Sequence, residues 1–313
     1  MGDWLKDKVA VITGSGRGIG KGIAMAFVEQ GAKVVINDLG ASSSGEGASK
    51  VADEVVEEIK QAGGEAVANY DSVASMEGGE RIIQTAVDAF GRLDILCTCA
   101  GFLRDRMLFN MSEEEWDSVL GVHLKGTFAC SKAAAILFRQ QRSGRILTFT
   151  STSGLYGNTG QCNYSAAKSG IAGFTKVISL DLGRYGVTVN SIAPMAGTRM
   201  TLTDEYFRAR KLREDQGITR EGFGDFTPEV ENLPPEHVAP LAVYLASDKA
   251  SNINGQVIFI GGGTISYVAP PRPIKTIFKS ESEGRWTVDE LIDIVPSTLV
   301  AGVGNPSPPQ PPK

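Results

Sequence analysis

The segment Val9-Ala10-Val11-Ile12-Thr13-Gly14-Ser15-Gly16-Arg17-Gly18-Ile19-Gly20, followed by an apolar stretch through Phe27, decides the fold. The first four residues predict a buried strand and the apolar stretch predicts a helix. In the turn between them, Gly14 can bend sharply, Gly18 allows a phosphate to approach the backbone, and Gly20 lets the helix pack on the strand. An ordinary loop can also be rich in glycine. A strand before it and a helix after it favour a dinucleotide site made by Gly14, Ser15, Arg17, Gly18, Ile19 and Gly20.

Short apolar runs alternate with helix-length segments along the rest of the chain. The seven runs are Val9–Ile12, Val34–Ile36, Ala66–Ala68, Leu93–Cys97, Arg145–Phe149, Val187–Ile192 and Val257–Ile260. Their continuous hydrophobicity indicates strands buried on both faces, and the intervening segments, such as Gly20–Gln30, Lys50–Gln61 and Ser75–Phe90, indicate covering helices. The sequence therefore predicts an α/β fold: a single Rossmann-like, doubly wound, seven-stranded parallel sheet with helices on both faces.

The chain divides by composition into a domain and a tail. Residues 1–265 are predicted to form the dinucleotide-binding catalytic domain, in which residues 200–235, rich in charged and aromatic side chains, resemble a lid. Residues 266–313 form a C-terminal extension. There Thr287 and Glu290 fit a capping box that opens a short helix through Ile294, and the Pro-rich Asn305–Lys313 is predicted to be disordered.

The composition of the chain limits which partners it can bind and indicates its cellular compartment. The chain has 313 residues, of which 42% are hydrophobic, and a formal net charge of -5. This is ample for a buried core, and the negative charge disfavours binding to nucleic acid or to a membrane surface, so a small-molecule substrate is predicted. The charged Met1–Lys8 leaves no room for a leader, and no apolar run reaches membrane-spanning length, which favours the cytoplasm. Four cysteines without the spacing of a disulfide framework fit reduced thiols.

Acidic residues follow the second and third strands. Asp38 lies about 20 residues beyond the glycine turn, where a carboxylate can bind the ribose hydroxyls of NAD and repel the 2′-phosphate of NADP. NAD is therefore the predicted cofactor. NADP stays possible, because Arg17 could pair with a 2′-phosphate or equally be a solvated loop residue. Asp71 and Ser72 are expected near the adenine, although Asp71 could simply cap a turn.

A proton-transfer pair lies further along the chain. Tyr164 and Lys168 are four residues apart at the start of a predicted helix, so their side chains share a face. A tyrosine titrates near 10, and a neighbouring ammonium favours its phenolate, so Lys168 is expected to lower the pKa of Tyr164 toward a working range. Ser151, at the end of the fifth strand, could hydrogen-bond the reacting oxygen. Taken singly, each residue could be structural.

Together, the glycine turn Thr13–Gly20, the strand-end Ser151 and the pair Tyr164 and Lys168 resemble the short-chain dehydrogenase/reductase family in order and spacing. The resemblance covers about Leu5 to Ile265. It implies an NAD(P)-dependent oxidoreductase that interconverts a secondary alcohol and a ketone. Tyr164 would then be the general acid/base, Lys168 would also hold the nicotinamide ribose, and Ser151 would orient the substrate carbonyl. It also implies cofactor contacts from Cys99, Ala100, Gly101, Pro194, Ala196 and Thr198.

Two positions depart from the family pattern. The usual Asn-Asn-Ala-Gly after the fourth strand reads Thr98-Cys99-Ala100-Gly101, and the usual catalytic Asn is replaced by His123. Cys97 and Cys99 face the same way on a strand, but without further Cys or His nearby we expect packed thiols and no metal site. His123 could be structural, or its ring could hold the water that links Lys168 to solvent.

The residues around His123 also point to a branch of the family. Leu103–Met107, Ser112–Asp117, Val122–Gly126, Tyr156–Asn158 and Ala193–Thr201 resemble the (3R)-hydroxyacyl-CoA dehydrogenase part of peroxisomal multifunctional enzymes of type 2 and their bacterial relatives. A (3R)-3-hydroxyacyl-CoA is therefore the expected substrate, with Arg104, Arg106, Arg199, Arg208 and Arg210 as candidates to meet its phosphates. A hydroxysteroid or cyclic-alcohol dehydrogenase and a catalytically silent cofactor-binding subunit remain alternatives. Small residues along the Tyr164 helix, from Ala166 to Gly173, predict a homodimer or homotetramer.

Overall fold

The computed structural model describes residues 3–41, 50–202, 207, 211, 230–280, 282 and 284–303. Its contacts divide the chain into two compact units, Met1–Val268 and Ala269–Lys313. The first unit extends three residues beyond the boundary expected at residue 265, because a strand that the sequence did not reveal ends at Val268. Most of the expected lid and the segment Asn305–Lys313 lie outside the described residues.

The first unit is built on one eight-stranded sheet in the order β3-β2-β1-β4-β5-β6-β7-β8. The strands are β1 (Val9–Thr13), β2 (Lys33–Asn37), β3 (Ala66–Asn69), β4 (Ile95–Thr98), β5 (Gly144–Phe149), β6 (Val187–Met195), β7 (Val257–Gly261) and β8 (Thr264–Val268). The first seven are parallel. They coincide with the seven apolar runs, since strands covered on both faces need uninterrupted hydrophobicity.

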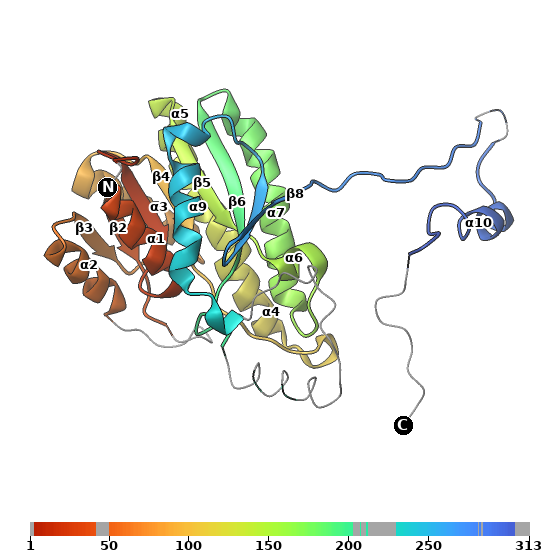
Figure 1. Cartoon of the computed structure of the whole chain (residues 1–313), viewed down its shortest axis with the longest axis horizontal. Coiled ribbons are helices and arrows are strands. Elements are labelled where there is room, and N and C mark those ends of the chain that lie inside the picture. Colours follow the sequence, from red (N-terminus) through yellow and green to blue (C-terminus); the bar gives the residue numbers. More distant parts are fainter. Residues whose placement is uncertain are drawn as a thin grey trace. The chain divides into compact units, whose positions relative to one another are not determined.

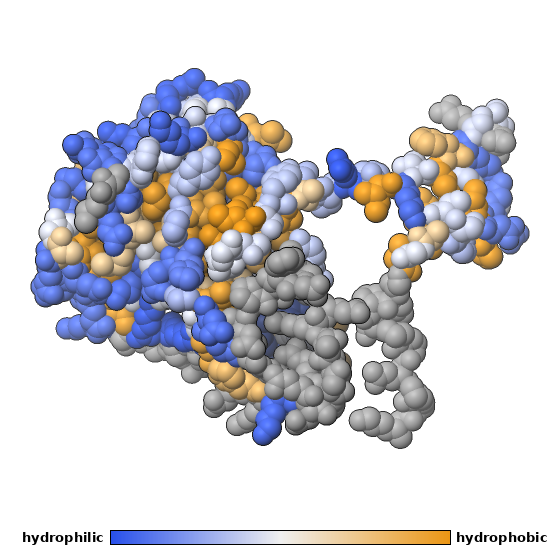
Figure 2. Space-filling model, in the orientation of Figure 1, coloured by the Kyte–Doolittle hydropathy of each residue, from blue (hydrophilic) through white to orange (hydrophobic). Residues whose placement is uncertain are grey.

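The prediction of seven strands is wrong by one. β8 runs antiparallel to β7, with Gly261 paired to Thr264, so that Gly262 and Gly263 form a two-residue hairpin loop. Gly262 has a φ of 57°, which favours glycine in such a loop. Along β8 exposure alternates, and Ile265 and Tyr267 are exposed. Figure 2 shows hydrophobic residues gathered in the part of the surface near β8 and α9 (Ala239–Ala246).

Helices cover both faces of the sheet (Figure 1). Side chains of α1 (Gly18–Glu29), α2 (Val51–Gln61) and α9 join one buried cluster, and side chains of α3 (Met76–Phe90), α5 (Gly126–Gln141) and α7 (Cys162–Gly183) join the other. Among the described residues, the unit also contains the helices α4 (Glu113–Leu120) and α6 (Thr152–Tyr156). Short turns lie at η1 (Leu108–Asn110), η2 (Gly121–Lys125), η3 (Val230–Asn232), η4 (Pro235–Val238) and η5 (Asp248–Ala250). The two clusters are the cores that hold the doubly wound sheet together.

The order of the strands places the site. β1 lies between β2 and β4, so the connections leaving β1 and β4 diverge to opposite faces of the sheet. In open α/β sheets a crevice forms at this point, outside the carboxyl ends of the strands. The ends of β1, β2, β4, β5 and β6 therefore surround one site.

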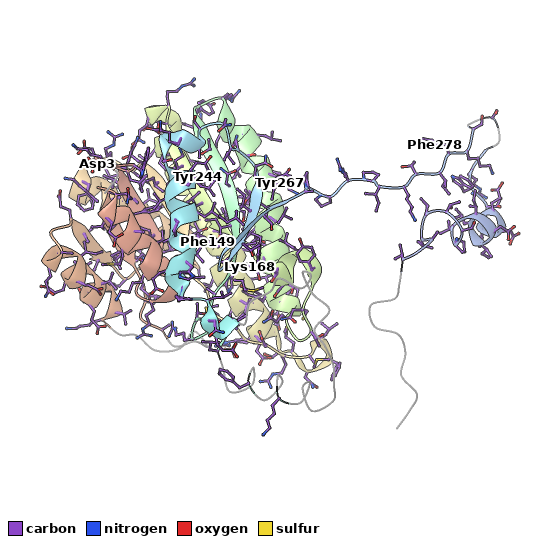
Figure 3. The ribbon with its side chains drawn as sticks, in the orientation of Figure 1. Asp3, Phe149, Lys168, Tyr244, Tyr267 and Phe278 are labelled. Atoms are coloured by element: carbon purple, nitrogen blue, oxygen red, sulfur yellow. The ribbon has the colours of Figure 1, made fainter. Side chains whose placement is uncertain are left out.

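The second unit, Ala269–Lys313, contains the predicted capped helix, α10 (Val288–Ile294). The Thr287 hydroxyl accepts a hydrogen bond from the Glu290 amide, and the Glu290 carboxylate accepts one from the Thr287 amide. Lys279 donates to the same carboxylate at 2.6 and 2.7 Å, which, with the backbone hydrogen bond, lowers the pKa of Glu290 to about 2. The capping box is confirmed. Phe278, which is labelled in Figure 3, is almost fully exposed, and so is Ile274.

Among the helices of the described residues, none combines the length and the hydrophobicity that a membrane crossing requires.

Candidate active site

The glycine turn leads from β1 into α1 as the sequence predicts. Gly14 and Gly18 have φ values of 65° and 55°, which favour glycine. A Cβ added to Gly20 would lie 2.3 Å from the Gly14 carbonyl oxygen, so only glycine lets the helix start this close to the turn. Arg17, the N-cap of α1, makes no side-chain cap. The amides of the first helical turn are therefore available to an anion.

Ser15 does not take the role expected of it. It is fully buried, its hydroxyl donates to the Ile12 carbonyl at 2.6 Å, and its amide donates to the Asn37 carbonyl at 3.1 Å. Both donors are used to fix the turn on the ends of β1 and β2. Ser15 supports the shape of the turn and does not line the cavity described below.

Asp38 follows β2 and lies beside the turn. Its carboxylate accepts hydrogen bonds from the amides of Gly16, at 2.9 Å, and Gly40, at 2.7 Å. Arg199, which donates to the Ala41 carbonyl at 2.9 Å, is close enough to have its pKa affected by Asp38 and Arg17; burial lowers that pKa most. The expected acid and two arginines thus meet at one end of the crevice.

Asp71 belongs to a network at the ends of β2 and β3. Its Oδ1 accepts from Arg81 at 2.6 Å and its Oδ2 accepts from Asn69 at 2.9 Å. Asn69 in turn accepts from Asn37 at 2.8 Å. The carboxylate is thus engaged within the protein, although Asp71 and Ser72 both line the cavity.

Ser151, Tyr164 and Lys168 converge where β5, α6 and α7 meet. Lys168 donates from Nζ to the Phe149 carbonyl at 2.6 Å, and these two residues lie beside each other in Figure 3. The same Nζ lies 5.5 Å from the centroid of the Tyr164 ring. Ser151 caps α6, accepts from the Ser153 amide at 3.2 Å and hydrogen-bonds Tyr164.

The pKa of Tyr164 differs from the expectation. Burial raises it to about 12, the hydrogen bond with Ser151 lowers it, and the charge of Asp105 raises it further. Burial also lowers the pKa of Lys168 to about 8. Burial therefore outweighs the lowering expected from the Lys168 ammonium, and the net shift of the pKa of Tyr164 is upward. In this environment Tyr164 is a phenol at neutral pH.

His123 is buried in η2, a wide π-helical turn between α4 and α5. Its Nε2 lies 2.8 Å from the Phe102 carbonyl oxygen, while Nδ1 has no hydrogen-bond partner among the described residues. Burial, with the charge of Lys168, lowers its pKa to about 3, so the ring is neutral. The ring packs edge-on against Tyr164, with centroids 5.1 Å apart. The structure thus brings His123 to the catalytic cluster.

The residues after β4 close the floor of the site. A Cβ on Gly101 would lie 2.1 Å from His123 Cε1, so glycine makes room for the ring. The Ala100 amide donates to Thr13 Oγ1 at 3.2 Å, and burial raises the pKa of the Cys99 thiol. All four cysteines, Cys97, Cys99, Cys130 and Cys162, are free. No cluster of three or more potential metal ligands occurs in the part of the chain that the structure describes.

One cavity of about 1340 Å³ joins these groups. It is lined by every residue predicted for the cofactor and the proton chemistry except Ser15: Gly14, Arg17, Gly18, Ile19, Gly20, Asp38, Asp71, Ser72, Cys99, Ala100, Gly101, His123, Ser151, Tyr164, Lys168, Pro194, Ala196 and Thr198. Among the residues that the structure describes, a Cβ on Gly18 would have only Thr198 Cγ2, 3.8 Å away, as a near neighbour. The uncapped helix start, this open space and the fixed Asp38 fit a dinucleotide with its phosphates at the turn.

The arginines expected to meet substrate phosphates differ in whether they line the cavity. Arg104 and Arg106 pair with Glu114 and Glu115 at 2.8 and 3.2 Å and do not line the cavity. Arg199 does line it. Arg208 and Arg210, with Tyr206, Phe223 and Phe226 of the expected lid, lie outside the described residues.

Sequence reasoning missed the residues that hold the loop 102–106 against the start of α7. Asn163, fully buried, donates to the carbonyls of Arg104 at 3.0 Å and Glu115 at 2.9 Å. Gln161 donates to Asp105 at 2.8 Å. The available signal was their position: Asn163 directly precedes Tyr164, and Gln161 is the N-cap of the same helix, α7.

Comparison with known proteins agrees with this geometry. The family model described as Enoyl-(Acyl carrier protein) reductase matches residues 14–264. A short-chain type dehydrogenase/reductase of Mycobacterium tuberculosis is 44% identical over 267 residues, which are 85% of this chain and 86% of the relative. Peroxisomal multifunctional enzyme type 2 of Mus musculus is 42% identical over 277 residues, 88% of this chain and 34% of the relative.

Two further proteins extend the comparison. A 3-oxoacyl-(acyl-carrier-protein) reductase of Synechocystis is 39% identical over 265 residues, 84% of this chain and 99% of the relative. The crystal structure of a short chain dehydrogenase from Mycobacterium avium superposes with a TM-score of 0.78 at 40% identity and covers 98% of both chains. The chain spans about a third of the multifunctional enzyme.

The fold and the cavity define a nicotinamide-dependent oxidoreductase. The chain belongs to the short-chain dehydrogenase/reductase family. The resemblance inferred from its three motifs is confirmed.

Proposed function

We propose that the protein oxidises a (3R)-3-hydroxyacyl-CoA to the 3-keto thioester, with NAD as cofactor. One observation carries the proposal: Ser151, Tyr164 and Lys168 line the same cavity as the glycine turn. A bound NAD would accept the hydride from the substrate carbon. The acyl thioester is supported by the similarity to relatives named as multifunctional enzymes and 3-oxoacyl reductases.

Tyr164 exchanges the proton of the reacting oxygen. With its pKa raised to about 12, it is a phenol at neutral pH and is ready to donate to a ketone oxygen. In the oxidation direction it must first lose that proton, so the phenolate fraction limits the rate. Ser151, which hydrogen-bonds Tyr164, donates to the same oxygen and fixes its position.

Lys168 and His123 act behind Tyr164. Lys168 is buried with its Nζ on the Phe149 carbonyl, on the cavity wall, where it can hold a ribose hydroxyl. Neutral His123 has an unpartnered Nδ1 among the described residues and lies close enough to Lys168 for their charges to interact. We propose that this nitrogen holds a water that carries protons between Lys168 and solvent.

NAD is proposed over NADP because the Asp38 carboxylate is fixed by two backbone amides next to the turn. A carboxylate in that place binds ribose hydroxyls and repels a 2′-phosphate. The positive charges of Arg17 and Arg199 weaken this repulsion, so NADP is expected to bind, but more weakly than NAD.

The test is a panel of alcohols assayed for NADH formation with the purified protein. Oxidation of (3R)-3-hydroxyacyl-CoA, and not of the (3S) isomer, is the expected result. Preferential oxidation of hydroxysteroids or cyclic alcohols would replace the acyl substrate with the second candidate. NAD binding without turnover of any alcohol would indicate a silent subunit.

We also propose a homo-oligomer that pairs through α5 and α7. Phe128 and Ile136 on α5 and Val177 and Leu180 on α7 are exposed hydrophobic residues, and a Cβ on Gly173 would meet no atom of the described residues within 4 Å. Light scattering should give a dimer or tetramer, and Leu180→Glu should shift it toward the monomer. The cytoplasm remains the proposed location.

A further inference from the structure

The loop 102–106 presents one charged side chain to the catalytic end of the cavity. Phe102, Leu103 and Asp105 line the cavity, whereas Arg104 and Arg106 do not. Both arginines are neutralised by carboxylates of α4, at 2.8 and 3.2 Å. The extended loop therefore separates its charges, and the negative charge of Asp105 faces the space in which substrate must bind.

The Asp105 carboxylate is held in place. Its Oδ2 accepts from Gln161 at 2.8 Å, and Gln161 accepts from Asn158 at 3.0 Å. The loop backbone is fixed as well: the Arg106 amide donates to the Gly160 carbonyl at 2.8 Å. Gln161 precedes Tyr164 by three residues, so the chain of hydrogen bonds ties Asp105 to the start of the catalytic helix.

The charge of Asp105 acts on Tyr164, at the reacting end of the cavity. It raises the pKa of Tyr164, which places it within electrostatic range of the phenol. Lys168 also lines the cavity, and its Nζ is engaged by the Phe149 carbonyl at 2.6 Å. The cations of the loop itself, Arg104 and Arg106, are paired with α4 and do not line the cavity. A substrate that brings a second negative charge beside the reacting carbon is repelled by the Asp105 carboxylate.

We propose that Asp105 is a specificity-determining residue that admits a neutral acyl ester or thioester beside the reacting alcohol and rejects the free carboxylate. The proposal deepens the hydroxyacyl function and rests on it for the acyl substrate. Two like charges about 6 Å apart, at an effective dielectric constant of about 20, correspond to on the order of a hundredfold in affinity, and screening by solvent reduces this to about tenfold.

The test compares ligands that differ only in charge. A 3-oxo acid and its methyl ester are titrated by calorimetry against the enzyme–NAD complex, which cannot reduce them, and the (3R)-hydroxy acid and its ester are compared as substrates. The wild type should favour the ester at least about tenfold. Asp105→Asn, which can still accept from Gln161, should bring the two ligands within about twofold by strengthening acid binding and leaving ester binding unchanged.

Asp117→Asn is the matched control, because Asp117 lies on α4 and does not line the cavity. It removes the same charge and should leave the ester preference unchanged. An unaltered preference in Asp105→Asn, or an equal change in both variants, would overturn the proposal. Absence of turnover with any hydroxyacyl substrate would instead refute the proposed function, and the binding ratio would still test Asp105.

Discussion

Gly101→Ala tests whether His123 positions Tyr164. Gly101 has no positive φ, so alanine is compatible with its backbone, but the new methyl would lie 2.1 Å from His123 Cε1. The ring must move by about 1.3 Å to reach an ordinary contact of about 3.4 Å. It is buried, held at Phe102 and packed against Tyr164, so the displacement is passed to the catalytic phenol.

Overpacking of this kind costs about 1–3 kcal/mol, which lowers Tm by about 2–12 °C in a domain of this size. A displacement of about 1 Å at Tyr164 should lower kcat/KM by on the order of a hundredfold. Calorimetry and initial rates of NADH formation measure the two effects. Gly121→Ala is the control: its backbone is helical and nothing lies within 4 Å, so stability should rise slightly.

The double variant Gly101→Ala/His123→Ala, together with the two single variants, forms a double-mutant cycle. Its methyl fills space left by the ring, so the double variant should be less destabilised than the sum of the single variants by about 1 kcal/mol or more. Additive effects, or a Gly101→Ala variant with the Tm of the wild type, would refute the packing argument.

The remaining predictions concern the proton chemistry and the cofactor. Tyr164→Phe should lower kcat about 10²–10⁴-fold while NADH affinity stays within twofold, as measured by fluorescence titration. In the wild type, kcat for oxidation should rise from pH 7 to 10, because the phenolate fraction grows toward a pKa of about 12; a flat profile would exclude Tyr164 as the base. Lys168 has a folded pKa of about 8, below its ordinary 10.5, so the unfolded chain binds more protons between these values and stability rises with pH. Urea unfolding should show a gain of about 2 kcal/mol from pH 8 to 10 relative to Lys168→Met. Asp38→Ser should raise NADP affinity at least about tenfold relative to NAD, because Arg17 and Arg199 would then be unopposed; an unchanged ratio would place the discrimination elsewhere.

The seven parallel strands could be predicted because burial on both faces demands continuous apolar runs. β8 was missed because it lacks such a run: its exposure alternates along the strand. It also follows three glycines, which suggested that the domain ends there. The alternation of Ile265 and Tyr267 with smaller residues was the available signal. Ser15 shows another limit, because a motif position does not tell whether a hydroxyl faces the ligand or the preceding strand.

Charge balance in the site depended on partners remote in sequence. Arg104, Asp105 and Arg106 read as a mainly basic stretch, which suggested phosphate binding. In the fold, both arginines pair with carboxylates of α4, and Asp105 faces the cavity. Asn163, which donates to the Arg104 carbonyl, helps to fix the loop in this arrangement. The meeting of Ser151, Tyr164 and Lys168 in one cavity could be predicted, because the strand-end serine and the four-residue spacing on one helix together resemble the family motif.

The environment of Tyr164 connects these findings. Burial and the charge of Asp105 both raise the pKa of Tyr164, and the hydrogen bond with Ser151 offsets them only in part. Tyr164 is then protonated at neutral pH and only a small fraction of it is phenolate, so reduction should depend little on pH near neutrality while oxidation improves in alkali. Removing the charge of Asp105 should therefore change two properties together, by admitting anionic substrates and by moving the oxidation profile to lower pH. A variant that changed substrate charge preference without moving the profile would show that Asp105 meets the substrate but not the phenol.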